Sequence, residues 1–200
     1  WNTHLFGSLN IARALQAYLP DTLMVHVSSG LVYGSTAASG APLTEESLLA
    51  PTDEYSTSKA AADLALGALS GRGLRVVRMR PFNHTGPGQA PDFVIPDWAN
   101  QIAQIEAGQR EAIMRVGNLE AARDFCDVRD VADAYVSVIE NRDAIQSGEI
   151  FNLASGTPRR VGDMLDKLLS LSEVEIELQQ DPARMRPADL PSIAGDASLA

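Results

Sequence analysis

Two apolar runs of strand length lie on either side of a helical segment in this 200-residue chain. Residues 23–27 and 74–79 are rich in apolar side chains without alternation, which is typical of strands that a parallel sheet buries on both faces. Residues 53–69 have the length and composition of a helix, and Gly71 and Gly73 follow it. A strand, a helix and a second strand in this order predict a right-handed crossover. The expected fold class is α/β, with a doubly wound parallel sheet.

The alternation of helices and strands continues on both sides of this unit. Apolar positions from Leu5 to Leu19 repeat at helical spacing and stop at Pro20. Small and turn-forming residues at 35–51 and 83–89 predict loops. We expect helices at residues 93–108, 128–140 and 161–171, and a strand at residues 150–154.

Charge and composition exclude several classes of function. A net charge of −10 argues against a nucleic-acid partner or an anionic membrane surface. No apolar run reaches the roughly 18 residues that a membrane span requires, and no signal peptide opens the chain. The single cysteine, Cys126, excludes an internal disulfide and suits a reducing compartment. The sequence therefore predicts a soluble, cytoplasmic protein.

Three residues near the first strand form the pattern that most directly indicates catalysis. Ser29 follows the strand in the segment Ser-Ser-Gly-Leu-Val-Tyr-Gly, and Tyr55 and Lys59 follow on the helix as Tyr-x-x-x-Lys. Residues four apart share one helix face, so the Lys59 ammonium can lie beside the Tyr55 phenol and favour its ionised form. Tyr55 would then act as a general acid or base, and the Ser29 hydroxyl would polarise the substrate oxygen.

Nearly the whole chain resembles the extended short-chain dehydrogenases/reductases that act on nucleotide-sugars. Within that family it is similar to the reductases of GDP-4-keto-6-deoxy-hexoses, which yield products of the GDP-D-rhamnose type. The resemblance is carried by Ser29, Tyr55 and Lys59 and by a series of later segments. These segments lie at residues 80–89, 93–94, 101–108, 116–121, 123–131, 186–191 and 195–196.

The resemblance implies two domains, one that binds the cofactor and one that binds the nucleotide-sugar. Residues 1–86 and 125–155 would form the C-terminal part of a Rossmann-like dinucleotide-binding domain, and residues 87–124 and 156–200 a small α/β nucleotide-sugar domain. It also implies a nicotinamide cofactor, NADP or NAD, bound by Tyr55, Lys59 and Pro81. The GDP-sugar would be bound by Ser29, Asn83, Phe93, Val94, Arg123, Arg186 and Asp189.

The residue types at the expected GDP-sugar site suit their expected ligands. Arginine presents a planar fork that matches phosphate oxygens, which makes Arg123 and Arg186 candidates for the diphosphate. An ion pair with a neighbouring acid is the alternative for each arginine. Asp189 would accept from ribose hydroxyls, Asn83 would hydrogen-bond the ligand, and Phe93 and Val94 would lie near the base.

The residues after the catalytic serine favour reduction over dehydration. In the related 4,6-dehydratases an acid pair stands at these two positions, whereas this chain has Gly30 and Leu31, which cannot exchange protons. Reduction of a 4-keto group requires only the triad and a reduced nicotinamide. Two alternatives stay open: a nucleotide-sugar 4-epimerase, and a nucleotide-sugar binding fragment without activity.

The binding-fragment alternative follows from a motif that the sequence does not contain. Dinucleotide-binding folds carry a glycine-rich turn before a helix that holds the pyrophosphate, and no such turn occurs here. We therefore expect that about three βα units preceding Trp1 are absent. The sequence does not discriminate NADH from NADPH. A homodimer through the helices that follow the catalytic strands is expected from the resemblance.

The remaining residues that could carry chemistry have plainer interpretations. His4 stands where the family commonly has an asparagine that supports the lysine, which leaves that part of the proton path open. His26 is expected to be a satisfied core histidine, and His84 a loop residue or a neighbour of the ligand. Cys126 is expected to pack as a small apolar residue, and Arg129 to pair with a nearby aspartate. No metal site is expected.

Overall fold

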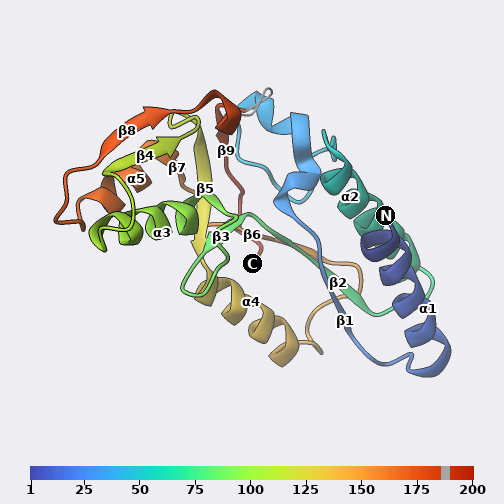
Figure 1. Ribbon diagram of the computed structural model, residues 1–200. Helices are drawn as coiled ribbons and strands as arrows, with labels where there is room; N and C mark the ends of the chain where they lie inside the picture. The colour runs from blue at the N-terminus through green and yellow to red at the C-terminus, as the bar shows by residue number, and fades with distance from the viewer. Residues whose placement is uncertain (186–189) are drawn as a thin grey trace.

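The computed structural model describes residues 1–185 and 190–200 (Figure 1). Its helical segments are a π-helical turn (Asn2–Gly7), α1 (Ser8–Tyr18), a 3₁₀ segment (Gly30–Ser39), α2 (Glu54–Ser70), α3 (Val94–Glu106), α4 (Val128–Glu140), α5 (Val161–Leu169) and a 3₁₀ turn (Pro182–Arg184). Its strands are β1 (Met24–Val27), β2 (Val76–Pro81), β3 (Asn83–Thr85), β4 (Ile113–Val116), β5 (Ala122–Asp127), β6 (Ile150–Leu153), β7 (Pro158–Arg160), β8 (Glu177–Gln180) and β9 (Ser192–Ile193). Among the described residues, no helix is long and apolar enough to cross a membrane.

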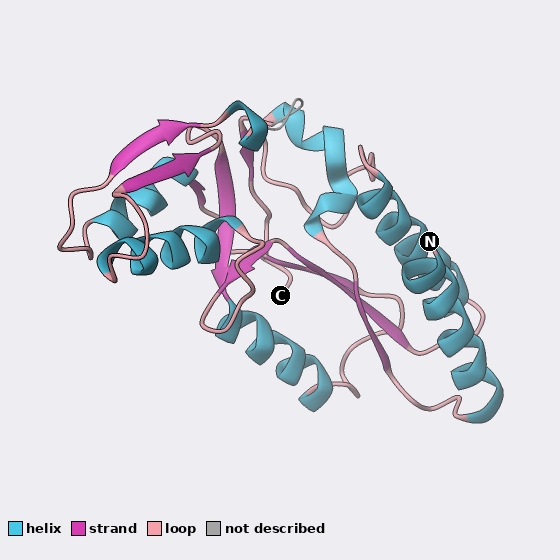
Figure 2. Ribbon diagram, viewed as in Figure 1, coloured by secondary structure: helices cyan, strands magenta, loops and turns pink. Residues whose placement is uncertain are grey.

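The expected α/β fold is present, with a parallel sheet in the order β1–β2–β6. Successive residues of β2 face opposite sides of this sheet, as the pleat requires. Val76 packs with Ala12 and Leu66 from α1 and α2, whereas Val77 packs in a cluster with Val131 of α4. Helices therefore cover both faces of the sheet, as Figure 2 shows.

Strand β1 is less buried than its apolar sequence predicts. His26 is its only buried residue, and Val27 is 45% exposed. The physical reason is its position, because within the described residues β1 pairs with β2 alone and forms the edge of the sheet. The expectation that a sheet buries this strand on both faces is therefore wrong for this structure, whereas β2 fulfils it.

The expected loop at residues 35–51 is also partly helical. A 3₁₀ segment runs from Gly30 to Ser39 and is kinked at Gly34, which has φ of 48° and ψ of −122°. A Cβ at Gly34 would lie 2.0 Å from the carbonyl oxygen of Ala50, so only glycine fits there. The kink returns the chain toward the start of α2, the helix that carries Tyr55 and Lys59.

A second group of strands and helices lies beside the parallel sheet (Figure 1). Strand β5 pairs with β3 and β9 in parallel and with β7 antiparallel, and β4 pairs with β8. Helices α3 and α5 enclose a separate core, in which Trp98, Met114 and Leu165 are almost fully buried. The expected helices at 93–108 and 161–171 are confirmed within a few residues. Strand β3 lies inside a segment that the sequence predicts to be a loop.

Buried charge joins α2 to β2. Asp63 of α2 is fully buried and accepts hydrogen bonds from Arg78 and Arg80, each at 2.9 Å. Burial raises the pKa of Asp63, but the hydrogen bonds and charge of Arg80 outweigh this effect, so its pKa is lowered. Arg80 also donates to the Tyr33 hydroxyl, which donates in turn to Asn152 of β6. This cluster fixes the helix that carries Tyr55 and Lys59.

Candidate active site

Ser29 lies immediately beyond the carboxyl end of β1. It has an extended backbone and caps the 3₁₀ segment, because its hydroxyl oxygen accepts from the backbone N–H of Leu31 at 3.2 Å. The hydroxyl hydrogen is not used in that bond. Ser29 is only 8% exposed, so its side chain is held by packing and by the cap. The expectation that a hydroxyl stands at the end of the first strand is confirmed.

Tyr55 and Lys59 lie in the first two turns of α2, beside the end of β1. Asp53 starts this helix in a capping box with Ser56, which places Tyr55 close to the helix N-terminus. Lys59 donates from Nζ to the carbonyl oxygen of Val27 at 2.8 Å, and Nζ lies 6.0 Å from the centre of the Tyr55 ring. Burial lowers the pKa of Lys59. Tyr55 is 48% exposed, so its ring remains open to a ligand.

The structure adds two residues to this site that the motif alone does not predict. The His4 ring lies edge-on to the Tyr55 ring, with centroids 5.3 Å apart and planes at 89°. His4 Nδ1 is also 2.8 Å from the Ser58 hydroxyl, which donates to the carbonyl oxygen of Tyr55. The sequence signal for His4 is its departure from the asparagine that the resembling family commonly carries there, whereas Ser58 gives no signal in the sequence.

Crowding at Gly30 restricts which side chains can follow Ser29. A Cβ at Gly30 would lie 2.9 Å from the Phe82 ring. That ring is 6% exposed, stacks on Tyr33 at 6.2 Å, and is approached on another side by Gly195. An acidic side chain at position 30 would therefore require Phe82 to move. Leu31 is 43% exposed and carries no proton-transfer group.

The expected ligand-binding residues lie on β2, β3, the start of α3 and β5. Pro81 ends β2, and Asn83 begins β3, where it pairs in register with Phe125 of β5. Phe93 caps α3 and is 57% exposed, and Val94, the first residue of that helix, is 42% exposed. These exposed apolar side chains are available for contact with a flat ring.

Arg123 is half-buried on β5 and is held by backbone groups. Its Nη1 donates to the carbonyl oxygens of Ala122 and Leu190, at 2.7 and 2.8 Å. This contact joins β5 to the segment that follows residues 186–189. Arg186 and Asp189 lie outside the described residues, so the structure does not place them relative to Arg123.

Four other residues singled out by the sequence are placed as follows. His26 is buried, but within the described residues its Nε2 has no hydrogen-bond partner, so the expectation of a satisfied core histidine is wrong. His84 lies on β3, with Nδ1 3.0 Å from the carbonyl oxygen of Phe82. Cys126 packs against the α4 side of the sheet, and burial raises its pKa to about 11. Arg129 pairs with Asp127, which confirms the expected ion pair.

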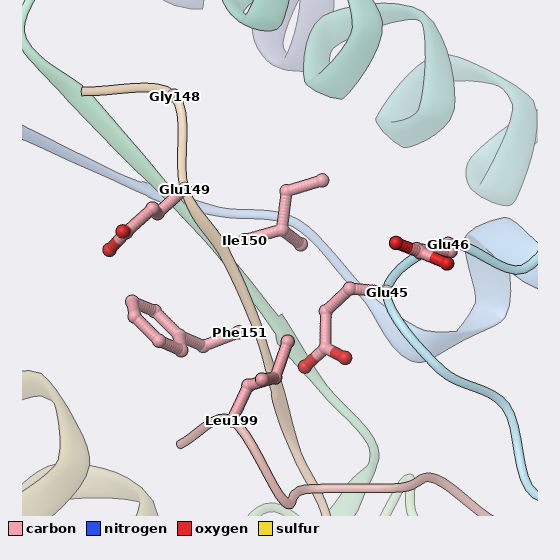
Figure 3. Close-up of a pocket in the computed structure, with 7 residues that line it drawn as sticks. All are labelled: Glu45, Glu46, Gly148, Glu149, Ile150, Phe151 and Leu199. Atoms are coloured by element: carbon pink, nitrogen blue, oxygen red, sulfur yellow. The ribbon is translucent and has the colours of Figure 1, made fainter. Parts of the chain in front are cut away.

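A cavity of about 490 Å³ lies elsewhere, beside β6 (Figure 3). Its walls carry three carboxylates and no cationic side chain, and none of the three expected catalytic residues lines it. Three carboxylates would repel a diphosphate. The cavity is lined by Glu45, Glu46, Gly148, Glu149, Ile150, Phe151 and Leu199.

Comparison with known proteins places this geometry in a family. Residues 1–154 match the NAD dependent epimerase/dehydratase family. The chain belongs to that family. It is 38% identical over 193 residues to the GDP-6-deoxy-D-mannose reductase of Pseudomonas aeruginosa, over 96% of the chain and 62% of that protein. It is 27% identical to a UDP-glucose 4-epimerase of Corynebacterium glutamicum, over 94% of the chain and 67% of that protein.

The fold is also similar to that of a solved structure. The structure of RMD from Pseudomonas aeruginosa complexed with NADPH has a TM-score of 0.89 and 34% identity, covering 99% of this chain and 65% of that one. This chain therefore spans less than two thirds of the length of that protein. The family match ends at residue 154, so β7 to β9 and α5 lie beyond it.

Proposed function

We propose that the protein reduces the 4-keto group of a GDP-4-keto-6-deoxy-hexose to give a GDP-6-deoxy-hexose of the GDP-D-rhamnose type. The single observation that supports this most strongly is the placement of Ser29, Tyr55 and Lys59 around the end of β1, with no acid at Gly30 or Leu31. The similarity to a GDP-6-deoxy-D-mannose reductase supports the choice of substrate.

Each residue of the triad has a separate part in the proposed reaction. A bound reduced nicotinamide, NADPH or NADH, would supply the hydride. Tyr55 gives its phenolic proton to the substrate oxygen that becomes a hydroxyl, and the Ser29 hydroxyl donates to the same oxygen and orients it. Lys59 is fixed by Val27, and its ammonium stabilises the negative charge left on Tyr55. Pro81 would line the cofactor site beside Tyr55 and Lys59.

The proposed GDP site uses residues outside the triad. Arg123 and Arg186 would contact the diphosphate, Asp189 the ribose, and Asn83 a polar group of the ligand. Phe93 and Val94 would cover the base with their exposed apolar surfaces. In this proposal residues 1–86 and 125–155 form the cofactor domain, and residues 87–124 and 156–200 form the nucleotide-sugar domain.

The test is the balance of cofactor and product in the intact protein. With GDP-4-keto-6-deoxy-mannose and NADPH or NADH, we expect one reduced cofactor to be consumed for each GDP-6-deoxy-hexose formed. A nucleotide-sugar 4-epimerase, favoured by the similarity to the UDP-glucose 4-epimerase, would interconvert sugars without net consumption. Binding of GDP without turnover would instead indicate the other alternative, a nucleotide-sugar binding protein without activity. Either of these results would overturn the proposal.

Two further proposals concern assembly and compartment. Ile11 of α1 and Leu64 of α2 are 57% and 58% exposed, although both helices pack on the sheet. Exposed apolar side chains on neighbouring helices support a homodimer through α1 and α2. The single, half-buried Cys126 supports placing the protein in the cytoplasm.

A further inference from the structure

His4 contacts the proposed catalytic tyrosine in two ways. Its ring edge meets the Tyr55 ring at 5.3 Å, in the T-shaped arrangement that aromatic pairs prefer. Its Nδ1 lies 2.8 Å from the hydroxyl of Ser58, which is 2% exposed and donates to the Tyr55 carbonyl oxygen at 2.8 Å. One contact acts on the side chain of Tyr55 and the other on its backbone.

The hydrogen bonds around Ser58 bear on which His4 nitrogen carries the proton. A serine hydroxyl has one hydrogen, and Ser58 gives it to the Tyr55 carbonyl. With that hydrogen used, the hydroxyl oxygen is left to accept from His4, and this assignment places the proton on Nδ1 of the neutral ring. The alternative, in which Ser58 donates to Nδ1, places the proton on Nε2. The segment that presents His4 is a π-helical turn (Asn2–Gly7), a rare geometry that recurs at functional sites.

We propose that His4 is a positioning residue for Tyr55, which it orients through Ser58 and through the ring contact while its imidazole is neutral. This inference rests on the proposed reductase function. Because His4 contacts the side chain and, through Ser58, the backbone of Tyr55, its loss would change the angle at which the phenol meets the substrate. It would lower the rate of proton transfer without changing nucleotide affinity.

The charged groups around His4 favour its neutral form. Lys59 and Tyr55 face it from α2, and His26 faces it from β1. Burial, followed by the charge of Lys59, lowers the pKa of His4. Protonation at acidic pH would place a second cation beside Lys59, so we expect turnover to decline as His4 becomes charged.

The first test does not depend on turnover. The chain has three histidines, so ¹⁵N-detected NMR can assign each ring by substitution. We expect His4 to be the Nδ1–H tautomer in the wild type and to lose that preference in Ser58→Ala. His84, whose Nδ1 partner is the Phe82 carbonyl, is the internal control and should not change. An Nε2–H tautomer of His4 in the wild type would overturn the inference, whatever the reaction proves to be.

The second test separates the two contacts in the intact protein. His4→Phe keeps a ring edge, His4→Asn keeps a donor for Ser58, and His4→Ala keeps neither. We expect kcat to fall roughly tenfold to a hundredfold in His4→Ala with KM unchanged, and less in the other two variants. The acidic decline of kcat should be absent from His4→Asn. Wild-type kcat and pH profile in His4→Ala, in a protein that reduces its substrate, would overturn the inference.

Discussion

At the scale of single residues, Tyr55 has the side chain on which the proposed reaction most directly depends. Tyr55→Phe removes one oxygen and keeps the ring that contacts His4, so the surrounding structure should persist. We expect kcat to fall by about 10²–10⁴-fold, the usual contribution of a general acid, while GDP affinity is unchanged. Stopped-flow oxidation of NADPH and calorimetric titration of GDP measure the two quantities. Near-normal NADPH oxidation by the variant would refute the role of Tyr55.

Arg123 and Arg129 form a matched pair of arginines on or next to the same strand. Arg123 is half-buried and is proposed to contact the diphosphate, whereas Arg129 is exposed and paired with Asp127. Arg123→Ala should weaken GDP binding by about 1.5–3 kcal/mol, the value of a hydrogen bond to a charged group. We expect the same of Arg186→Ala, and no measurable change in Arg129→Ala. Equal GDP affinities in all three variants by calorimetry would remove both arginines from the site.

His26 should make stability depend on pH. Burial lowers its pKa to about 4, whereas an unfolded histidine has the ordinary value near 6.5. The unfolded chain therefore binds the proton first as the pH falls. The contribution of neutral His26 is complete above pH 6.5 and is lost between about pH 6.5 and 4, with a magnitude of about 3 kcal/mol.

Replacement of His26 tests this linkage. In His26→Leu, urea unfolding followed from pH 7 to pH 4 should show a free energy of unfolding that declines less steeply than in the wild type. The pKa of Asp63 is also lowered, so Asp63 contributes to the pH dependence of the free energy of unfolding equally in both proteins. Superimposable pH dependences would mean that His26 is not neutral in the folded state.

At the scale of elements, the charged cluster of Asp63, Arg78 and Arg80 attaches α2 to β2. Asp63→Asn would leave the buried Arg80 and the partly buried Arg78 without a counter-charge, so we expect a loss of about 3–5 kcal/mol in the free energy of unfolding. The matched control is Asp163→Asn, which breaks an exposed ion pair with Arg160 and should cost less than about 1 kcal/mol. Equal midpoints of urea unfolding for the two variants would contradict this account.

The elements differ in how far the sequence predicts them. Strand β2 and helix α2 carry continuous apolar or helical patterns, and the expected triad lies within this one βαβ unit. Strand β8 is mostly polar and each of its four residues is exposed to solvent, so no apolar pattern marks it. Its pairing with β4 joins residues far apart in the chain. The same limit applies to the site. The contact between Phe82 and Gly30, and the missing partner of His26, depend on where distant segments come together.

At the scale of the whole molecule, two apolar surfaces could drive self-association. One is the proposed dimer face on α1 and α2, which includes Ile11 and Leu64, and the other is the edge strand β1 with exposed Val27. We expect analytical ultracentrifugation to give a dimer that Ile11→Asp with Leu64→Asp converts to a monomer. Val27→Lys is the comparison variant, because a charge on an edge strand blocks edge-to-edge pairing. If Val27→Lys alone gives the monomer, the dimer forms through the sheet edge instead.

The packing of Phe82 affects which substitutions at residue 30 the fold can tolerate. Since its ring occupies the space where a side chain at residue 30 would begin, the effect of a mutation at residue 30 depends on which residue is present at position 82. A lineage in which Gly30 became acidic first would inherit a damaged core before it gained any new reaction. A shift of the Phe82 ring or a smaller residue at position 82 would make room, at the cost of contacts that Phe82 makes in the core, its stacking on Tyr33 among them. Residues 30 and 82 are therefore expected to be energetically coupled, so that a side chain at residue 30 costs less stability where residue 82 is small.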